Sequence, residues 1–285
     1  MKIGFVGAGK VGFTLGKFFS VNGFQVTGYY SKHFDSAREA ALFTGTKAYD
    51  TLDALVCDSD TLFLTVPDGE ISSVYSSVSK CGISEKIICH CSGAMSVAEA
   101  FFDLSRHGAY GYSIHPLFPI SNKLEAYREL GGAFFVLEGD GRHIHMWQTL
   151  LQSLGVRVHV INGAEKSRYH AACAISSNLI CALVEESVEL LESCGFSRQL
   201  ALEAITPLLR SNLEHIIEDG PVKALTGPVE RCDTSTVKKH LACLPSLPER
   251  ELYRYASHKL LTLAAAKNPG RDYSPLEKLL DEGEI

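Results

Sequence analysis

KIGFVGAGKVG at residues 2–12 joins a short apolar run to the glycine pattern G-x-G-x-x-G. The run predicts a first β-strand, and the glycines predict a tight turn into a helix over residues 12–22. Gly7 permits the turn, Gly9 lets the backbone approach a pyrophosphate, and Gly12 lets helix and strand pack closely. A bland glycine turn is the alternative, but the strand before the turn and the amphipathic helix after it favour dinucleotide binding at the helix N-terminus. The residues expected to bind the phosphates are Gly7, Ala8, Gly9, Lys10, Val11 and Gly12.

The bulk composition describes an ordinary globular protein. The chain has 285 residues, 46% of them hydrophobic and 21% charged, which suits about two domains of roughly 150 residues each. The net charge is −6 and there is no basic tract, so nucleic acid and anionic membranes are poor partners. The start of the chain is unlike a signal peptide, and the apolar run over 171–184 is interrupted by serine and asparagine, so we expect no membrane span.

The nine cysteines are an odd number scattered along the chain, which favours reduced thiols and a cytoplasmic protein. Cys89-His90-Cys91 suggests a metal at first sight. Neighbouring residues in a strand point to opposite faces, however, and no second pair of ligands completes a tetrahedral set. We therefore expect no metal site.

Strand-like and helical stretches alternate through the first half of the chain, which predicts a doubly wound, mostly parallel sheet. After Asn162-Gly163 the pattern becomes helical throughout, beginning with one long helix over 164–194 that Gly195 ends. The sequence thus predicts an α/β Rossmann domain over 1–162 and an all-helical domain over 163–285. The predicted strands are 2–7, 24–30, 61–66, 87–90, 111–114, 133–137 and 157–161, and the other predicted helices are 34–44, 72–78, 96–104, 143–154, 198–218, 234–244, 249–266 and 275–281.

The second predicted strand ends in Tyr30-Ser31-Lys32, where an NAD-preferring protein places a carboxylate on the ribose 2′-hydroxyl. A hydroxyl and a cation instead suit a 2′-phosphate, so Ser31 and Lys32 favour NADP over NAD. A polar loop that merely lacks an acid is the alternative. Val66, Pro67 and Asp68 follow another apolar strand, where the turn should border the cofactor, although Pro67 also suits a helix start.

Three further places on the chain carry side chains suited to catalysis. Ser92 either caps the following helix or orients the substrate, and His115, before a proline at a strand end, is either structural or catalytic. Lys166, His170 and Ser177 recur at helical spacing on one face of the predicted long helix, with Asn178 at its edge. Polar groups aligned on a helix that otherwise reads as buried suggest the lining of an interdomain cleft. A solvated stripe is the alternative.

With these residues together, the chain resembles the superfamily in which a Rossmann domain precedes a helical domain like the C-terminal part of 6-phosphogluconate dehydrogenase. Its members include 3-hydroxyisobutyrate dehydrogenases, pyrroline-5-carboxylate reductases, ketopantoate reductases and prephenate dehydrogenases. The chain is similar to a bacterial family of Rossmann-like NADP oxidoreductases with a C-terminal domain of unknown function. The resemblance covers nearly the whole chain and rests on G-A-G-K-V-G at 7–12, V-P-D at 66–68, S-G at 92–93, H-P-L at 115–117, K-S-R-Y-H-A-A at 166–172 and L-T-G-P-V-E-R at 225–231.

The resemblance also implies roles for single residues. Lys166 resembles the lysine that hydroxyacid dehydrogenases of this superfamily use as proton donor, while His170 stands where their asparagine would follow and Asn178 lies too far along. His115 resembles the histidine that contacts the substrate hydroxyl in prephenate dehydrogenases. Arg231 suits a substrate carboxylate or is a surface residue beside Asp233, the expected cap of the next helix. The family usually has glycine where this chain has Cys232.

Together these observations predict an NADP-dependent oxidoreductase that moves a hydride to or from a small hydroxy- or keto-acid-like metabolite. Lys166 or His170 would be the acid–base group, His115 a hydrogen-bonding helper, and Ser92 an orienting group. An imine reductase of the pyrroline-5-carboxylate type and an NADP-binding sensor without turnover are the alternatives. Because the predicted long helix is too apolar for a small helical domain to cover, we expect a homodimer.

Overall fold

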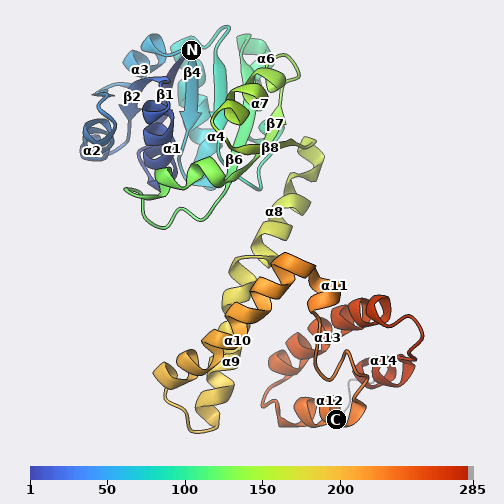
Figure 1. Cartoon of the computed structure of the whole chain (residues 1–285). Coiled ribbons are helices and arrows are strands. Elements are labelled where there is room, and N and C mark those ends of the chain that lie inside the picture. The colour runs from blue at the N-terminus through green and yellow to red at the C-terminus, as the bar shows by residue number, and fades with distance from the viewer. Residues whose placement is uncertain (282–285) are drawn as a thin grey trace. The chain divides into compact units, whose positions relative to one another are not determined.

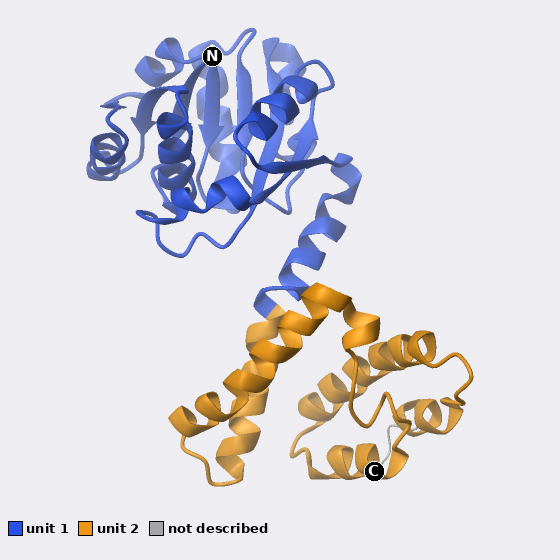
Figure 2. Cartoon of the chain, in the orientation of Figure 1, with its two compact units in different colours: residues 1–178 blue, residues 179–285 orange. Residues whose placement is uncertain are grey.

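The computed structural model describes residues 1–281, and the chain divides into two compact units at residues 178 and 179 (Figure 2). This division comes later than the predicted domain boundary after residue 162, because the helix over 166–175 belongs to the first unit.

The first unit is built on one eight-stranded sheet with helices on both faces (Figure 1), as the alternating pattern predicts. Its strand order is β3-β2-β1-β4-β5-β6-β7-β8, and all neighbouring strands pair in parallel except β6 and β7. The chain moves outward from β1 in one direction and then returns to add β4 on the other side, which makes β1/β4 the switch point where ligands bind in such sheets. The strands are β1 Lys2–Val6, β2 Gln25–Tyr30, β3 Lys47–Ala48, β4 Thr61–Leu64, β5 Ile87–His90, β6 Tyr110–Leu117, β7 Phe134–Gly139 and β8 Arg157–Val160.

Alternate residues of the strands enter two separate hydrophobic cores. Phe5 and Phe63 pack on one face with the helices that precede and follow β2 and with the helix after β7, whereas Leu62 and Leu64 pack on the other. Both faces of the central strands are buried, so these strands read as continuous apolar runs in the sequence. The helices of this unit are α1 Lys10–Val21, α2 Phe34–Thr44, α3 Leu52–Asp58, α4 Asp68–Val78, α5 Val97–Ala100, α6 Leu104–His107, α7 Ile144–Ser153 and α8 Lys166–Ile175.

Several predicted elements need correction. The single helix predicted over 96–104 is two short helices, α5 and α6, and the sequence reading missed β3 and α3. The continuous helix predicted over 164–194 is also wrong: a 3-10 turn at Gly163–Glu165 precedes α8, and α8 ends at Ile175. The hydroxyl of Ser176 donates to the carbonyl of Ala172, and such back-bonding gives the chain an alternative to the regular helix.

The second unit is helical throughout its described part. Leu241, Leu261 and Leu276 belong to a small apolar core. The sequence reading located α10, α12, α13 and α14 to within a few residues, merged α9 with α8, and missed the short α11. The helices are α9 Asn178–Ser193, α10 Arg198–Asp219, α11 Pro221–Ala224, α12 Thr234–Cys243, α13 Leu247–Lys267 and α14 Ser274–Asp281.

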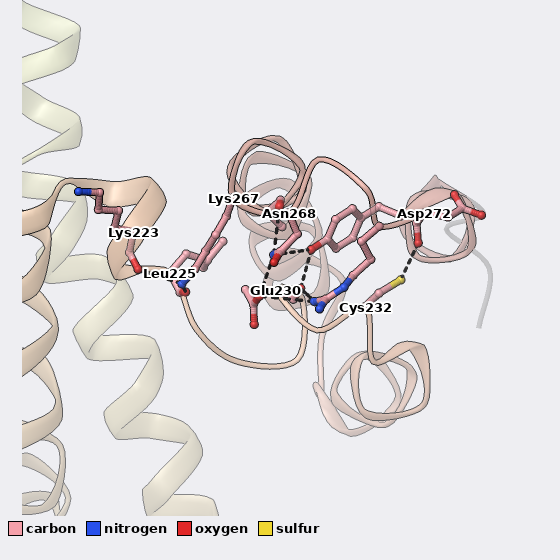
Figure 3. Close-up of polar contacts among 10 residues, drawn as sticks. Lys223, Leu225, Glu230, Cys232, Lys267, Asn268 and Asp272 are labelled. Carbon is pink, nitrogen blue, oxygen red and sulfur yellow. Dashed lines mark hydrogen bonds and ion pairs between the residues drawn. The ribbon is translucent and has the colours of Figure 1, made fainter.

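The loop that contains Glu230 is fixed by a polar network against the end of α13 (Figure 3). The side-chain amide of Asn268 donates to the Glu230 carboxylate at 2.8 Å, and Tyr273 donates to the Glu230 carbonyl at 2.6 Å. Cys232 in this loop has a φ of 58°, a left-handed conformation that costs a side chain with Cβ roughly 1–2 kcal/mol. Glycine adopts that conformation without this cost, which is consistent with the glycine that the resemblance implies at this position. Asp233 then caps α12 by accepting from the backbone of Thr236, as expected.

Candidate active site

The glycine turn between β1 and α1 has the geometry that the sequence predicts. Gly7 has a φ of 102°, and a Cβ there would lie 2.7 Å from the carbonyl oxygen of Thr65. A Cβ on Gly12 would lie 2.3 Å from the Thr65 hydroxyl, which itself donates to the Gly7 carbonyl. Gly9 is the N-cap of α1 without a side-chain cap, and a Cβ on it would meet only one protein atom, 3.8 Å away. The turn therefore packs tightly against β4 and leaves space beside Gly9 and the first N–H groups of α1.

A cavity of about 600 Å³ opens at this turn, at the carboxyl ends of β1, β2 and β4. Seven of the predicted cofactor residues line it: Gly7, Ala8, Gly9, Ser31, Lys32, Val66 and Pro67. Residues that the sequence analysis did not single out for the cofactor also line it: Val6, Tyr30, Ser36, Leu52, Thr65, Glu70, Val74 and Ser77. A cavity with a glycine turn, a helix N-terminus and apolar walls fits a dinucleotide in size and chemistry.

Four predicted cofactor residues do not line this cavity. Lys10, Val11 and Gly12 belong to the first turn of α1. Asp68 starts α4, and its carboxylate accepts a hydrogen bond from the Ser92 hydroxyl at 2.6 Å.

Ser92 is buried in the turn that follows β5. Besides donating to Asp68, its hydroxyl oxygen accepts from the backbone N–H groups of Ala94 and Met95, at 3.2 and 3.0 Å. These contacts fix the turn and favour the turn role, one of the two that the sequence left open.

Lys166, at the start of α8, is buried to 1% exposure. Its ammonium donates to the Ser92 carbonyl at 2.8 Å and to the Ser113 hydroxyl at 2.6 Å. Burial lowers the pKa of Lys166 to about 8, and the negative charge of Glu138 opposes that shift. The ammonium thus joins α8 to the ends of β5 and β6.

His115 lies on β6 beyond the point where β5 ends. β5 pairs with β6 as far as Ser113, whereas β7 pairs with β6 as far as Leu117, so β7 still supports His115. Its Nδ1 lies 2.6 Å from the hydroxyl of Tyr169 on α8. Burial and the charge of Lys166 lower the pKa of His115 to about 4, so the ring is neutral near pH 7.

Gly93 provides the space in which two imidazoles meet. The ring centroids of His115 and His170 are 6.3 Å apart, and His170 is exposed. A Cβ on Gly93 would lie 2.6 Å from His170 Cδ2 and 3.0 Å from two ring atoms of His115. Only a residue without a side chain leaves both rings where they are.

The structure thus brings together four of the five predicted catalytic residues: Ser92, His115, Lys166 and His170. Asn178 is exposed at the start of α9, and Ser177 lies in the turn after α8, so the stripe predicted along one helix is confined to α8. Arg231 is exposed in the second unit.

Sequence reasoning missed Gly93, Ser113 and Tyr169 as site residues. Ser113 is two residues before His115 on β6, and residues at that spacing share a face of a strand. Tyr169 lies within the quoted motif over 166–172, but its contact with His115 is long-range in sequence. Over residues 1–281, no group of three or more His, Cys, Asp or Glu side chains is placed to hold a metal ion.

Two protein-family models match the chain, one in each half. A Rossmann-like domain family matches residues 1–116, and the domain of unknown function DUF2520 matches residues 133–260. No protein of curated function matches the chain in sequence.

Among solved structures, protein TM1727 from Thermotoga maritima is 26% identical with a TM-score of 0.74, over 94% of this chain and 99% of its own. A candidate NADP oxidoreductase from Bacteroides fragilis, BF3122, is 19% identical with a TM-score of 0.72, over 92% and 98%. An imine reductase from Myxococcus stipitatus, solved with NADP⁺, is 14% identical with a TM-score of 0.60, over 99% and 100%. At 19% and 14% identity, the similarity to the last two structures shows a shared fold only. The chain therefore consists of a Rossmann-like domain followed by a C-terminal domain of the DUF2520 family.

Proposed function

We propose that the protein is an NADP-dependent oxidoreductase. The observation that carries this proposal is the cavity of about 600 Å³ at the glycine turn, in the same compact unit as the cluster of His115, Lys166 and His170. Strands in a sheet lie about 4.8 Å apart, so the end of β6 is roughly 10 Å from the end of β4. A dinucleotide that starts at the glycine turn can cover that distance. When bound, the nicotinamide supplies or accepts the hydride.

NADP is preferred to NAD in this proposal because Ser31 and Lys32 line the cavity at the end of β2. A hydroxyl and an ammonium bind a 2′-phosphate, whereas an acid at this strand end would repel it. The similar Bacteroides fragilis protein is described as an NADP oxidoreductase, and the Myxococcus stipitatus imine reductase was solved with NADP⁺. Both support the same choice. Glu70, the one carboxylate in the cavity lining, comes from α4 rather than from the end of β2.

The proposed substrate is a small hydroxy- or keto-acid-like metabolite, with reduction of a cyclic imine as the second candidate. The imine reductase among the similar folds favours the second candidate. Lys166 or His170 would exchange the proton, and His115 would hydrogen-bond the reacting group. The pKa of Lys166, about 8, lets it hold or release a proton near neutral pH.

The remaining alternative is an NADP-binding sensor without turnover. A sensor has no need of titratable groups gathered at the strand ends, so the cluster of His115, Lys166 and His170 favours an enzyme. Oxidation of NADPH by the purified chain, tested with a panel of 2-keto acids and cyclic imines, distinguishes the two.

Binding of the cofactor is tested by titrating the intrinsic fluorescence with NADPH and with NADH. A Gly9→Asp variant has room for its Cβ but places a carboxylate at the phosphates, so it should lose at least tenfold in NADPH affinity. Gly141→Asp adds the same charge at an open position away from the cavity and should bind normally. Lys32→Asp should abolish the preference for NADPH. Equal binding by the Gly9→Asp and Gly141→Asp variants would refute the cofactor site.

We further propose that a second copy of the chain covers the apolar surface of the helical stretch Gly163–Ser193. By length and composition alone this stretch is long and apolar enough to cross a membrane, contrary to the expectation from the sequence. Only 6% of its apolar 18-residue segment is buried within the single chain. Exposed leucines continue on α10, where Leu208 is 65% exposed. An apolar surface of this extent is typical of an interface between subunits.

A further inference from the structure

The ring of His115 has one nitrogen engaged and one free. Nδ1 lies 2.6 Å from the Tyr169 hydroxyl. Nε2 has no hydrogen-bond partner within the described residues 1–281, and it borders the position that a Cβ on Gly93 would occupy. Since Gly93 has no side chain, this edge of the ring remains accessible. Nε2 is therefore the His115 atom that a substrate can reach.

Both members of the pair are neutral near pH 7. The pKa of His115 is lowered to about 4 by burial, by the Lys166 ammonium and by His170. Burial also raises the pKa of Tyr169, and the neighbouring Cys173 thiol adds to the shift. The phenol keeps its hydrogen, and the imidazole carries one proton on one of its two nitrogens.

The chemistry of the contact decides which nitrogen carries that proton. A neutral imidazole nitrogen is a stronger acceptor than a phenol oxygen, and the Cys173 thiol is a weak acceptor. The phenolic hydrogen is therefore best placed on Nδ1, and the proton on a neutral imidazole then occupies the other nitrogen. We propose that Tyr169 is a positioning residue that donates to Nδ1 of His115 and holds the ring as the Nε2–H tautomer.

The part that this tautomer plays toward a substrate rests on the proposed oxidoreductase function and narrows its substrate. A neutral Nε2–H group donates a hydrogen bond to a carbonyl oxygen or an imine nitrogen and so polarises the bond to the carbon that receives the hydride. It has no free lone pair with which to remove a proton from a substrate hydroxyl. His115 therefore recognises an acceptor atom, which suits reduction of a carbonyl or imine, and the acid–base step falls to Lys166 or His170.

The tautomer is measured by long-range ¹H–¹⁵N NMR of the full chain labelled with ¹⁵N-histidine at pH 7, without substrate. A His115→Asn variant identifies the His115 signals among the 11 histidines. The wild-type protein should show a protonated Nε2 and an unprotonated Nδ1. Tyr169→Phe removes the donor to Nδ1 and should lower the Nε2–H fraction below the wild-type value. His170→Ala, which leaves the Tyr169 contact in place, should keep the wild-type tautomer.

A protonated Nδ1 in the wild-type protein would overturn the proposal, as would an unchanged tautomer in a folded Tyr169→Phe variant. The wild-type spectrum decides the first point even where the variant fails to fold. The NMR measurement involves neither NADPH nor turnover. A failure of cofactor binding or activity would therefore contradict the proposed function and leave the tautomer assignment standing.

Discussion

Single residues at the strand ends determine what the site can do. Lys166 is buried beneath the turn after β5, His115 presents one ring edge beside Gly93, and His170 is exposed. A buried ammonium with two hydrogen bonds is well held, and an exposed imidazole is free to reach a ligand. Substituting Lys166 and His170 one at a time therefore shows which of them exchanges the proton.

Removing either proposed acid–base group should lower activity without removing the cofactor. For Lys166→Ala and His170→Ala we expect near-normal NADPH affinity, because neither residue lines the cofactor cavity. For the residue that supplies the proton, turnover should fall by about 10²–10⁴-fold, the usual contribution of a positioned proton donor. Steady-state rates with a substrate from the panel measure this. Full activity of both variants would transfer the acid–base role to another group.

At the scale of elements, α8 is joined to the sheet by the side chain of Lys166. The ammonium bonds to Ser92 after β5 and to Ser113 on β6, so it links three elements. The contact between Tyr169 and His115 adds a second link between α8 and β6. These bonds fix the relation between the helix and the strand ends on which the site depends.

The buried Lys166 should make stability depend on pH in a predictable way. Its pKa is about 8 in the folded chain and 10.5 in the unfolded chain, so between these values the unfolded state binds more protons. The contribution of Lys166 to the free energy of unfolding therefore increases by about 3 kcal/mol as the pH rises from about 8 to 10.5.

Denaturant unfolding of the wild-type protein and of Lys166→Met at pH 7.5 and pH 10.5 measures this change. The free energy of unfolding of the wild type should increase relative to the variant, because other titrating groups cancel in the comparison. A difference that is the same at both pH values would show that the Lys166 ammonium is not perturbed by burial.

On the scale of the whole molecule, α9 and α10 expose apolar side chains that we expect a second copy of the chain to bury. Leu183 on α9 and Leu208 on α10 are among several large side chains left exposed by the single chain. Burial of apolar surface contributes about 25 cal/mol per Å², so covering these side chains with a second copy favours association.

We expect light scattering after size exclusion to give twice the 31.1 kDa mass of the chain. Leu208→Glu places a charge in the proposed interface and should shift the protein toward monomer. Leu42→Glu is the matched control, because Leu42 is 84% exposed on α2 in the first unit, and it should leave the dimer intact. A wild-type monomer that binds phospholipid vesicles would instead indicate a membrane-facing helix.

The sequence by itself determined the architecture, the glycine turn and seven of the fifteen residues that line the cofactor cavity, because these depend on local patterns. Apolar periodicity marks strands and helices over a few residues, and each glycine of residues 7–12 acts on its immediate neighbours. It also selected Ser92 and His115, since strand ends in a parallel sheet lie at one edge, and Lys166 and His170, since they share one face at helical spacing.

Only the tertiary structure decided how those side chains are used. Burial of Lys166, the pairing of Asp68 with Ser92 and the contact of Tyr169 with His115 join residues between 24 and 74 positions apart. The end of α8 at Ile175 also removed Ser177 from the predicted helical stripe. These contacts depend on where neighbouring strands end and on how α8 packs against those ends. Residue spacing along the chain does not contain that information.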